Sequence, residues 1–351
     1  MNTVKVSAEH DYDVLIGCDW SSVLVEKIHN RTRVAVISSA QYSPDLSALK
    51  SLDCDLHLFE VPDGEDGKSS GVLLNLWNWL GAAGFTRSDL IVGIGGGAIT
   101  DLAGFAAATW LRGVDWIAVP TSLAGMVDAS VGGKTGINSE YGKNLIGAFH
   151  SPLSVIIDPS FLETLSARDI SAGMAEVIKC GFIADPEILK VAEQCDATSL
   201  VSNKAAVLDL ITRAVTVKAT VVSADFKESF AREALNYGHT LGHAIEKYSK
   251  YQMRHGEAVA IGMVFIAELA SARSLIDAET VQLHRDLLTR YELPTTFERS
   301  VWQKLAPLLS LDKKARGNTI RFVALDGIGS TLRLDDLTSD ELDAAYERIS
   351  S

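Results

Sequence analysis

The sequence predicts an α/β fold in which a parallel-sheet domain, residues 1–160, precedes a mainly α-helical domain, residues 161–351. The chain has 351 residues, which is enough for two domains with cores of their own. In the first part, short apolar runs alternate with segments of helical periodicity, a pattern typical of a parallel sheet covered by helices on both faces. After about residue 160 the strand-like runs nearly disappear and helical periodicity dominates.

The strands of the first domain are expected where β-branched and other apolar residues form short runs. These runs are residues 33–39, 55–61, 90–94, 115–120 and 153–158. Helices are expected at residues 71–84 and, directly after three consecutive glycines, at 98–111. A turn rich in glycine and aspartate follows the second strand.

The second domain is expected to be built from helices. Five segments have helical periodicity, namely residues 167–181, 204–223, 232–246, 256–272 and 278–291. One late hairpin is expected from the runs at 319–324 and 331–334, which flank a glycine-containing turn.

Composition excludes several classes of function. No apolar run reaches the ~20 residues of a membrane span, and the N-terminus lacks the apolar core of a secretory signal. The four cysteines form no paired motif, so we expect free thiols and a cytoplasmic protein. A net charge of −13 argues against nucleic-acid binding, whereas a local cationic pocket would still bind a small anion.

The most informative segment is the predicted helix 232–246, because its polar residues have specific chemistry and share one face. Steps of three and four place them together, as Arg232, Asn236, His239, His243 and Glu246. Burying such a set among Ala, Leu and Ile is costly unless a metal or an anionic ligand satisfies it. This segment therefore predicts the reaction centre.

A metal site is the first interpretation of the histidines. Glu176 lies three residues before Lys179 on a predicted apolar helix, and one Glu with two His is a common catalytic zinc set. Glu176, His239 and His255 could supply it, which would leave His243 for proton transfer. Two alternatives stay open: His239 and His243 both bind the metal, or the histidines are structural and satisfied by hydrogen bonds in the core.

A phosphate-binding site is the second interpretation. Gly95-Gly96-Gly97 links a strand to a helix, where backbone amides and the helix dipole favour a diphosphate, although a simple tight turn has the same pattern. Thr121 and Ser122 end the next strand, at the sheet edge where ligands bind. Four polar residues follow among small and apolar ones, with solvated loops as the alternative: Asp128, Lys134, Lys143 and Asn144.

Further cations accompany these sites. Lys218 lies in an apolar predicted helix, and a buried lysine or arginine needs an anionic partner. Lys313 and Lys314 form a pair late in the chain, for which a solvated loop is an equal alternative.

Together the motifs resemble the 3-dehydroquinate synthase family within the sugar-phosphate cyclases. The resemblance covers about residues 62–325, and the motifs occur in the family's order. They are Asp63-Gly-Glu65-Asp-Gly-Lys68, Gly95-Gly96-Gly97 with Asp101, Val131-Gly132-Gly133-Lys134-Thr-Gly-Ile-Asn138, Gly142-Lys143-Asn144, Ala175-Glu176-Val-Ile-Lys179, Leu235-Asn236-Tyr-Gly-His239-Thr-Leu-Gly-His243 and His255-Gly-Glu257.

The resemblance implies a Rossmann-like N-terminal domain, a helical C-terminal domain, NAD, and one divalent metal, zinc or cobalt. By motif matching, the implied metal ligands are Glu176, His239 and His255. The implied NAD contacts are Asp63, Glu65, Lys68, Gly96, Gly97, Asp101, Thr121, Ser122, Lys143 and Thr164. The implied catalytic and substrate-binding residues are Arg112, Asp128, Lys134, Asn144, Lys179, Lys218, Arg232, Asn236, His243, Lys313 and Lys314.

The resemblance also implies a reaction, the one by which the shikimate pathway of aromatic amino acid biosynthesis makes 3-dehydroquinate. The substrate would be 3-deoxy-D-arabino-heptulosonate 7-phosphate, which loses phosphate while NAD is used without net redox change. Lys134, Asn144, Asn236 and a lysine of the 313–314 pair would face the phosphate, and Lys218 and Arg232 the carboxylate. Arg112 matches an arginine that often completes the partner subunit's phosphate site, which implies a homodimer.

The sequence departs from the family pattern at Ser38-Ser39, where many members carry an Asp for the adenosine ribose, and at Thr121-Ser122-Leu-Ala-Gly125, which is smaller than usual. Three alternatives stay open. The chain could be another sugar-phosphate cyclase, such as a 2-deoxy-scyllo-inosose or 2-epi-5-epi-valiolone synthase, whose substrates lack the carboxylate. It could be a metal-dependent polyol dehydrogenase with net redox chemistry, or a metal-stabilised binding module without catalysis.

Overall fold

The structure is a computed structural model that describes residues 1–226, 231–309 and 320–351. It divides into two compact units. The first comprises Met1–Leu165 and Lys218–Lys227, and the second comprises Ser166–Val217 and Glu228–Ser351. The predicted Lys313 and Lys314 lie outside the described residues.

The first unit is built around a seven-stranded sheet in its described residues. In spatial order the strands are β1 (Asn2–Ser7), β2 (Asp11–Ile16), β9 (Ser154–Ile157), β6 (Asp115–Pro120), β5 (Leu90–Gly95), β3 (Arg33–Ser39) and β4 (Asp55–Val61). Only β1 and β2 pair antiparallel; the other neighbours are parallel. β5 is buried along its whole length, as expected for an apolar strand covered on both faces.

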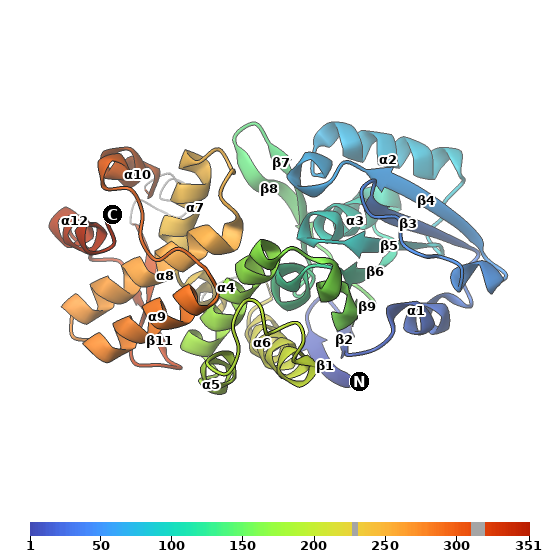
Figure 1. Cartoon of the computed structure of the whole chain (residues 1–351). Coiled ribbons are helices and arrows are strands. Elements are labelled where there is room, and N and C mark those ends of the chain that lie inside the picture. Colours follow the sequence, from blue (N-terminus) through green and yellow to red (C-terminus); the bar gives the residue numbers. More distant parts are fainter. Residues whose placement is uncertain (227–230, 310–319) are drawn as a thin grey trace. The chain divides into compact units, whose positions relative to one another are not determined.

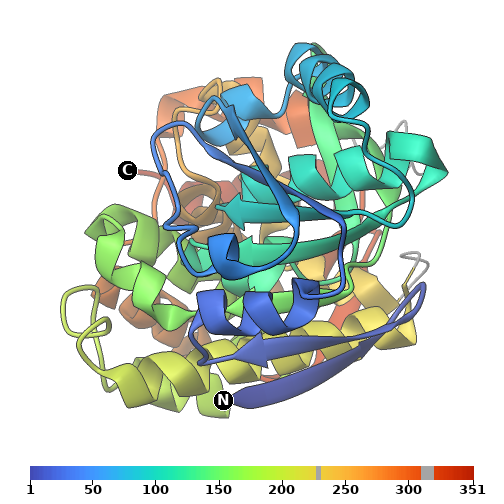
Figure 2. The ribbon, with the colours of Figure 1, turned by 90° about the vertical axis from the view of Figure 1, so that its right-hand side faces the viewer.

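Helices cover this sheet on both faces. α2 (Ser70–Ala82) and α3 (Gly97–Thr109) lie on one face and α1 (Trp20–Ile28) lies on the other (Figures 1 and 2). The chain passes from β3 to β4 on one side and returns to β5 on the other side of β3. The carboxyl ends of β3 and β5 therefore form a switch point, the place where open α/β sheets bind ligands.

A separate hairpin, β7 (Lys134–Ser139) and β8 (Gly142–Phe149), completes the first unit. No strand was expected here from the sequence pattern. Its alternation is weak because Gly136 and Gly147 face each other so closely that a side chain on Gly147 would lie 2.3 Å from the Thr135 carbonyl oxygen. Close backbone approach of this kind requires glycine, which carries no strand-like pattern.

The second unit is helical. Its helices are α4 (Ala167–Ile183), α5 (Glu187–Ala192), α6 (Lys204–Ala224), α7 (His239–Tyr248), α8 (His255–Ala272), α9 (Ala278–Arg290), α10 (Trp302–Leu309) and α12 (Ser339–Arg348). The last residues of α6 belong to the first unit. A hairpin pairs β10 (Phe322–Leu325) with β11 (Thr331–Leu334). α8 is the core helix, in contact with α4, α7, α9 and α12. By length and composition α8 could cross a membrane, but 78% of it is buried, as in a core helix.

Short helical turns complete the described chain. They are η1 (Leu49–Ser51), η2 (Gly64–Gly67), η3 (Trp110–Arg112), η4 (Gly125–Ala129), η5 (Pro159–Thr164), η6 (Ala231–Asn236) and η7 (Arg299–Val301).

Where the structure describes the chain, the strands and helices expected from the sequence are confirmed to within a few residues, with one correction. The segment 232–246 is not one helix: η6 ends at Asn236 and α7 begins at His239. The break lies at Gly238, whose φ is +79° and where a side chain would lie 2.9 Å from the Val259 carbonyl oxygen of α8. Tight packing against α8 therefore separates η6 from α7. The five polar residues of segment 232–246 are divided between these two elements, with Arg232 and Asn236 on η6 and the other three on α7. Further elements that the sequence pattern did not predict are β1, β2, α1, α5, α10 and α12.

Candidate metal centre and nucleotide site

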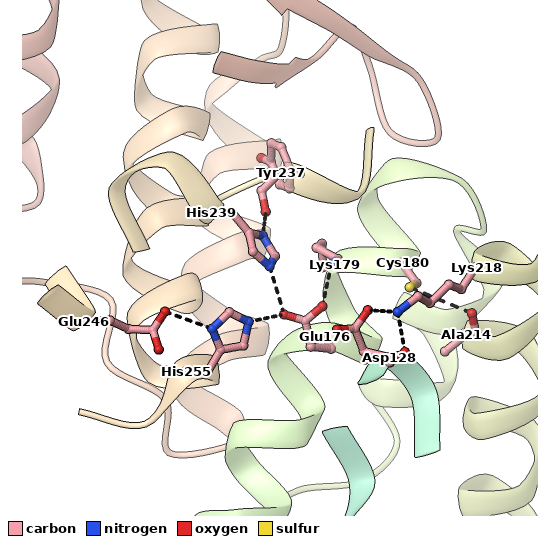
Figure 3. A network of polar contacts seen from close by, with 10 residues as sticks. All are labelled: Asp128, Glu176, Lys179, Cys180, Ala214, Lys218, Tyr237, His239, Glu246 and His255. Carbon is pink, nitrogen blue, oxygen red and sulfur yellow. Dashed lines mark hydrogen bonds and ion pairs between the residues drawn. The ribbon is translucent and has the colours of Figure 1, made fainter. Parts of the chain in front are cut away.

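Three side chains predicted as metal ligands converge in the second unit. Glu176 lies within α4, and His239 and His255 are the first residues of α7 and α8. Their ligand atoms all lie within 4.8 Å of one another. The Nε2 atoms of His239 and His255 lie 3.5 Å and 3.3 Å from Oε1 of Glu176 (Figure 3).

The start of α8 is fixed against α4, and this places His255 beside Glu176. The Glu257 carboxylate accepts from the backbone amide of Arg254, which precedes the helix, and also binds the Arg168 guanidinium of α4. Gly256 allows backbone contact between the helices, because a Cβ there would lie 1.9 Å from the Ala172 carbonyl oxygen. The distance between two predicted metal ligands, Glu176 and His255, therefore depends on a glycine.

The second nitrogen of each imidazole is held by a fixed acceptor. Nδ1 of His239 lies 3.1 Å from the Tyr237 carbonyl oxygen, and Nδ1 of His255 lies 3.0 Å from a carboxylate oxygen of Glu246 (Figure 3). A proton on each Nδ1 leaves each Nε2 as a lone-pair donor aimed at Glu176, the usual arrangement of metal-binding histidines. Glu246, which had no role in the sequence analysis, orients His255.

Charges in this cluster favour an ionised carboxylate. Burial alone would raise the pKa of Glu176, but the Lys179 ammonium, which pairs with its Oε2, and the two imidazoles hold that pKa well below its ordinary value. Burial and Lys179 lower the pKa of His239 to about 3. Burial would lower the pKa of His255 as well, but the neighbouring Glu176 and Glu246 carboxylates raise it to about 10 in the metal-free cluster, so a bound metal would displace a proton from its Nε2.

The cluster fits a divalent metal by its own chemistry. Oε1 of Glu176 is buried and has no hydrogen-bond partner among the described residues. Such an orphaned acceptor is costly, and a cation coordinated by it and two imidazole nitrogens would remove the cost. One carboxylate oxygen and two imidazole nitrogens form a donor set that both zinc and cobalt accept.

His243 lies beside this cluster, on the turn of α7 that follows His239. Its ring centroid is 5.3 Å from that of His239 and 6.0 Å from that of His255, and the residue is exposed. A second possible ligand group contains His243, Glu246 and His255, but within the described ranges no group contains both His239 and His243. This geometry favours the Glu176 set over the paired-histidine alternative.

The glycine turn of the first unit lies at the switch point of the sheet. Gly96 precedes α3 and the helix begins at Gly97. A Cβ on Gly97 would lie 2.9 Å from that of Ala129, so the turn fits only glycine without rearrangement. Thr121 donates its backbone amide to the Gly95 carbonyl, and the Ser122 hydroxyl lies 3.5 Å from where a Cβ of Gly96 would be. The turn therefore presents a helix N-terminus with small polar neighbours, the features that bind a diphosphate.

A charged network adjoins this turn. The buried Lys68 ammonium lies 2.6 Å from the Asp101 carboxylate and also donates to the Asn144 side chain. Burial raises the pKa of Asp101, against the opposing effect of Lys68. Glu65 accepts from Asn138 at 2.6 Å and lies 3.3 Å from the Lys143 ammonium. Predicted nucleotide and phosphate residues therefore form one network, which the sequence did not reveal.

The remaining predicted residues have separate positions. In the first unit, the buried Lys218 ammonium pairs with the carboxylate and the carbonyl oxygen of Asp128, while Lys134 and Thr164 are exposed. In the second unit, Arg232 is buried and Asn236 is partly exposed, both on η6.

Known proteins with similar sequences and folds cover the whole chain. Sequence models of the 3-dehydroquinate synthase N-terminal and C-terminal domains match residues 58–172 and 173–315. The 3-dehydroquinate synthase of Mycobacterium leprae is 48% identical over 99% of this chain and 98% of its own.

Two solved structures have similar folds. A 2-epi-5-epi-valiolone synthase from Streptomyces hygroscopicus, solved with NAD⁺ and Zn²⁺, has a TM-score of 0.89 at 26% identity, over 99% of this chain and 98% of its own. A 2-deoxy-scyllo-inosose synthase complexed with carbaglucose-6-phosphate, NAD⁺ and Co²⁺ has a TM-score of 0.88 at 25% identity, over 99% and 100%.

The fold is that of the sugar-phosphate cyclases. Sequence similarity over nearly the full length is more specific, and the chain belongs to the 3-dehydroquinate synthase family. It is therefore an enzyme of the phosphate-eliminating lyase type.

Proposed function

We propose that the chain converts 3-deoxy-D-arabino-heptulosonate 7-phosphate to 3-dehydroquinate and phosphate, with NAD and one divalent metal. Family membership supports the reaction, and the observation that carries it is the convergence of Glu176, His239 and His255 on one point. When bound, the metal polarises substrate hydroxyl groups and NAD accepts and returns a hydride. The protein's own side chains orient these groups and move protons.

At the metal centre, the proposed ligands are Glu176, His239 and His255. Lys179 keeps the carboxylate ionised, because it pairs with the oxygen that does not face the histidines. His243 is the proposed proton carrier: it is exposed to solvent, and its ring lies beside that of a ligand. An imidazole in this position takes a substrate hydroxyl proton and releases it to water near neutral pH.

At the nucleotide site of the first unit, the backbone amides of Gly96 and Gly97 are proposed to bind the diphosphate of NAD. The remaining proposed contacts are Glu65, Lys68, Asp101, Thr121, Ser122, Lys143 and Thr164. Asp63 is our candidate for the adenosine ribose, since the Ser39 hydroxyl donates to its carboxylate at 2.8 Å. Asp63 therefore lies next to the end of β3, where many family members carry an aspartate that binds the adenosine ribose. In this chain Asp63 would bind the ribose instead of that aspartate.

Buried cations favour the carboxylate-bearing substrate over those of related cyclases. Lys218 is 6% and Arg232 is 2% exposed, and both are proposed for the substrate carboxylate, with Asp128 holding Lys218. An arginine binds a carboxylate through two parallel hydrogen bonds. The substrate phosphate is assigned to Lys134, Asn144, Asn236 and the 313–314 lysine pair.

We further propose a cytoplasmic homodimer in which Arg112 serves the partner's phosphate site. Leu111 and Arg112 are exposed and have φ angles of +49° and +67°, which is strained backbone for such residues and often marks a functional position. On the β7–β8 hairpin, Leu145 and Ile146 are 64% and 44% exposed, which suits a protein interface. The described cysteines form no disulfide, which agrees with a reducing compartment.

Mixed dimers test the assignment of Arg112. Arg112→Ala and His239→Ala should each be inactive alone. If Arg112 acts on the partner, a re-equilibrated mixture should regain about a quarter of the wild-type rate, because half the dimers carry one complete site. No regain, despite mixed dimers shown by mass spectrometry, would place Arg112 in its own subunit's site or outside any site.

A substrate panel tests the reaction itself. Metal-loaded protein with NAD should release phosphate from the heptulosonate phosphate, without accumulating NADH, and should be inactive on glucose 6-phosphate and glycerol. Phosphate release from glucose 6-phosphate alone would indicate another cyclase. Accumulation of NADH with glycerol would indicate a polyol dehydrogenase, and no reaction with any substrate would favour a binding module.

A further inference from the structure

A second buried histidine besides His239, His284 on α9, has no part in the proposed reaction. It is 0% exposed and belongs to neither possible ligand group. Burying an imidazole is costly unless its ring nitrogens are hydrogen-bonded, and both nitrogens of His284 have partners. Its neighbours show what those contacts connect.

Both ring nitrogens of His284 are satisfied in one tautomer. Nδ1 lies 2.7 Å from the Thr280 carbonyl oxygen, which can only accept, so Nδ1 carries the proton. Nε2 lies 2.8 Å from the Tyr237 hydroxyl and therefore accepts from it. Tyr237 is itself 0% exposed. The hydrogen bond fixes the position of the Tyr237 side chain within the core.

The contacts of His284 connect it to two of the three predicted metal ligands, His239 and Glu176. The Tyr237 carbonyl accepts from Nδ1 of the ligand His239 at 3.1 Å. On its other side, the His284 ring stacks on Phe182, with 3.5 Å between ring centroids and 6° between planes. Phe182 belongs to α4, the helix that carries Glu176. One buried imidazole thus contacts the residue that orients one ligand and the helix that carries another.

We propose that His284 is a positioning residue of the metal centre, which holds Tyr237 and α4 in register so that His239 and Glu176 converge on one ion. The inference rests on the proposed function only in assuming that a divalent metal binds to Glu176, His239 and His255. The neutral state of the imidazole agrees with this role, since burial lowers the pKa of His284 to about 4. A neutral ring stacks on Phe182 and accepts from Tyr237 at physiological pH.

The test is metal binding by the full-length protein, with Tyr237→Phe as the main variant. This change removes the hydroxyl that His284 accepts from and keeps the ring and the backbone carbonyl. Tyr291→Phe is the matched control: Tyr291 is also 0% exposed in the second unit, and its hydroxyl donates at 2.9 Å to the Ala192 carbonyl of α5, a helix that carries no predicted ligand. Zn²⁺ affinity by competition with a chelating dye, and the visible spectrum of Co²⁺-loaded protein, are measured beside the melting temperature of the apo-protein.

We expect Tyr237→Phe to weaken Zn²⁺ binding by about tenfold, the lower end of the effect of partners that orient metal ligands, and to change the Co²⁺ ligand-field bands. Tyr291→Phe should lower the melting temperature comparably and leave affinity and spectrum unchanged. His284→Leu should weaken binding at least as much, and His284→Gln, which keeps an acceptor for the hydroxyl, should restore part of it.

The proposal is overturned if Tyr237→Phe binds Zn²⁺ like the wild type and has its Co²⁺ spectrum, whatever its melting temperature. It is equally overturned if Tyr291→Phe loses as much affinity, because the effect would then be general destabilisation. A wild-type protein that binds no stoichiometric metal would instead contradict the proposed function, so the two failures are distinguishable.

Discussion

The neutral, buried His284 should make the stability of the protein depend on pH. Its pKa is about 4 in the folded state and about 6.5 when unfolded, because burial disfavours the charged ring and the nearby Arg285 adds repulsion. The folded state therefore binds this proton less readily than the unfolded state. The stabilising contribution is complete above pH 6.5 and is lost as pH falls towards 4.

The size of the effect follows from the two pKa values. A separation of about 2.5 units corresponds to about 3 kcal/mol of stability, which is lost in full only below pH 4, where the folded state is protonated as well; about 2 kcal/mol of it is lost by pH 5. His284→Phe abolishes the titration but leaves the Tyr237 hydroxyl without its acceptor, a cost of about 1–3 kcal/mol that does not depend on pH in this range. The variant should therefore be less stable at pH 7.5, and the gap should narrow by about 2 kcal/mol at pH 5.

Urea unfolding of the chelator-treated proteins at pH 7.5, 6 and 5 measures this gap. Taking the difference between wild type and variant cancels the contribution of titrating groups whose surroundings the substitution leaves unchanged. An equal gap at all three pH values would refute the burial argument, since it would mean that His284 has the same pKa folded and unfolded.

Three further predictions test the assignment of individual residues. His239→Ala should lose the metal, while His243→Ala should keep it and lose rate by about 10²–10⁴-fold; equal metal loss by dialysis and elemental analysis would support a paired-histidine site instead. Gly256→Ala should weaken metal binding by tenfold or more, because its methyl group would lie 1.9 Å from a carbonyl oxygen, whereas Gly71→Ala, with open space around it, should bind normally. Asp63→Asn should raise the Kd for NAD in calorimetry without changing metal content, and an unchanged Kd would remove Asp63 from the ribose site.

Much of the site was predictable because its chemistry depends on residue type. A glutamate and histidines within apolar helices indicate a metal on desolvation grounds alone, and the apolar run before Gly95 indicates a buried parallel strand. The three predicted ligands, Glu176, His239 and His255, have ligand atoms within 4.8 Å of one another.

What the sequence could not predict are features set by contacts between distant segments. The break at Gly238 arises from packing against α8, and the hairpin β7–β8 depends on glycines that carry no strand pattern. The contact between His284 and Tyr237 joins positions 47 residues apart, and no local periodicity encodes it.

Phosphate release from 3-deoxy-D-arabino-heptulosonate 7-phosphate is the most direct test of the account. The reaction should contain NAD far below the substrate concentration and be run with metal-loaded and chelator-treated protein. We predict many turnovers per NAD, no net NADH, loss of activity with the chelator and recovery on adding Zn²⁺ or Co²⁺. Full activity in the chelator-treated protein, with metal shown to be absent, would contradict the metal centre, and no release by the loaded protein would contradict the function.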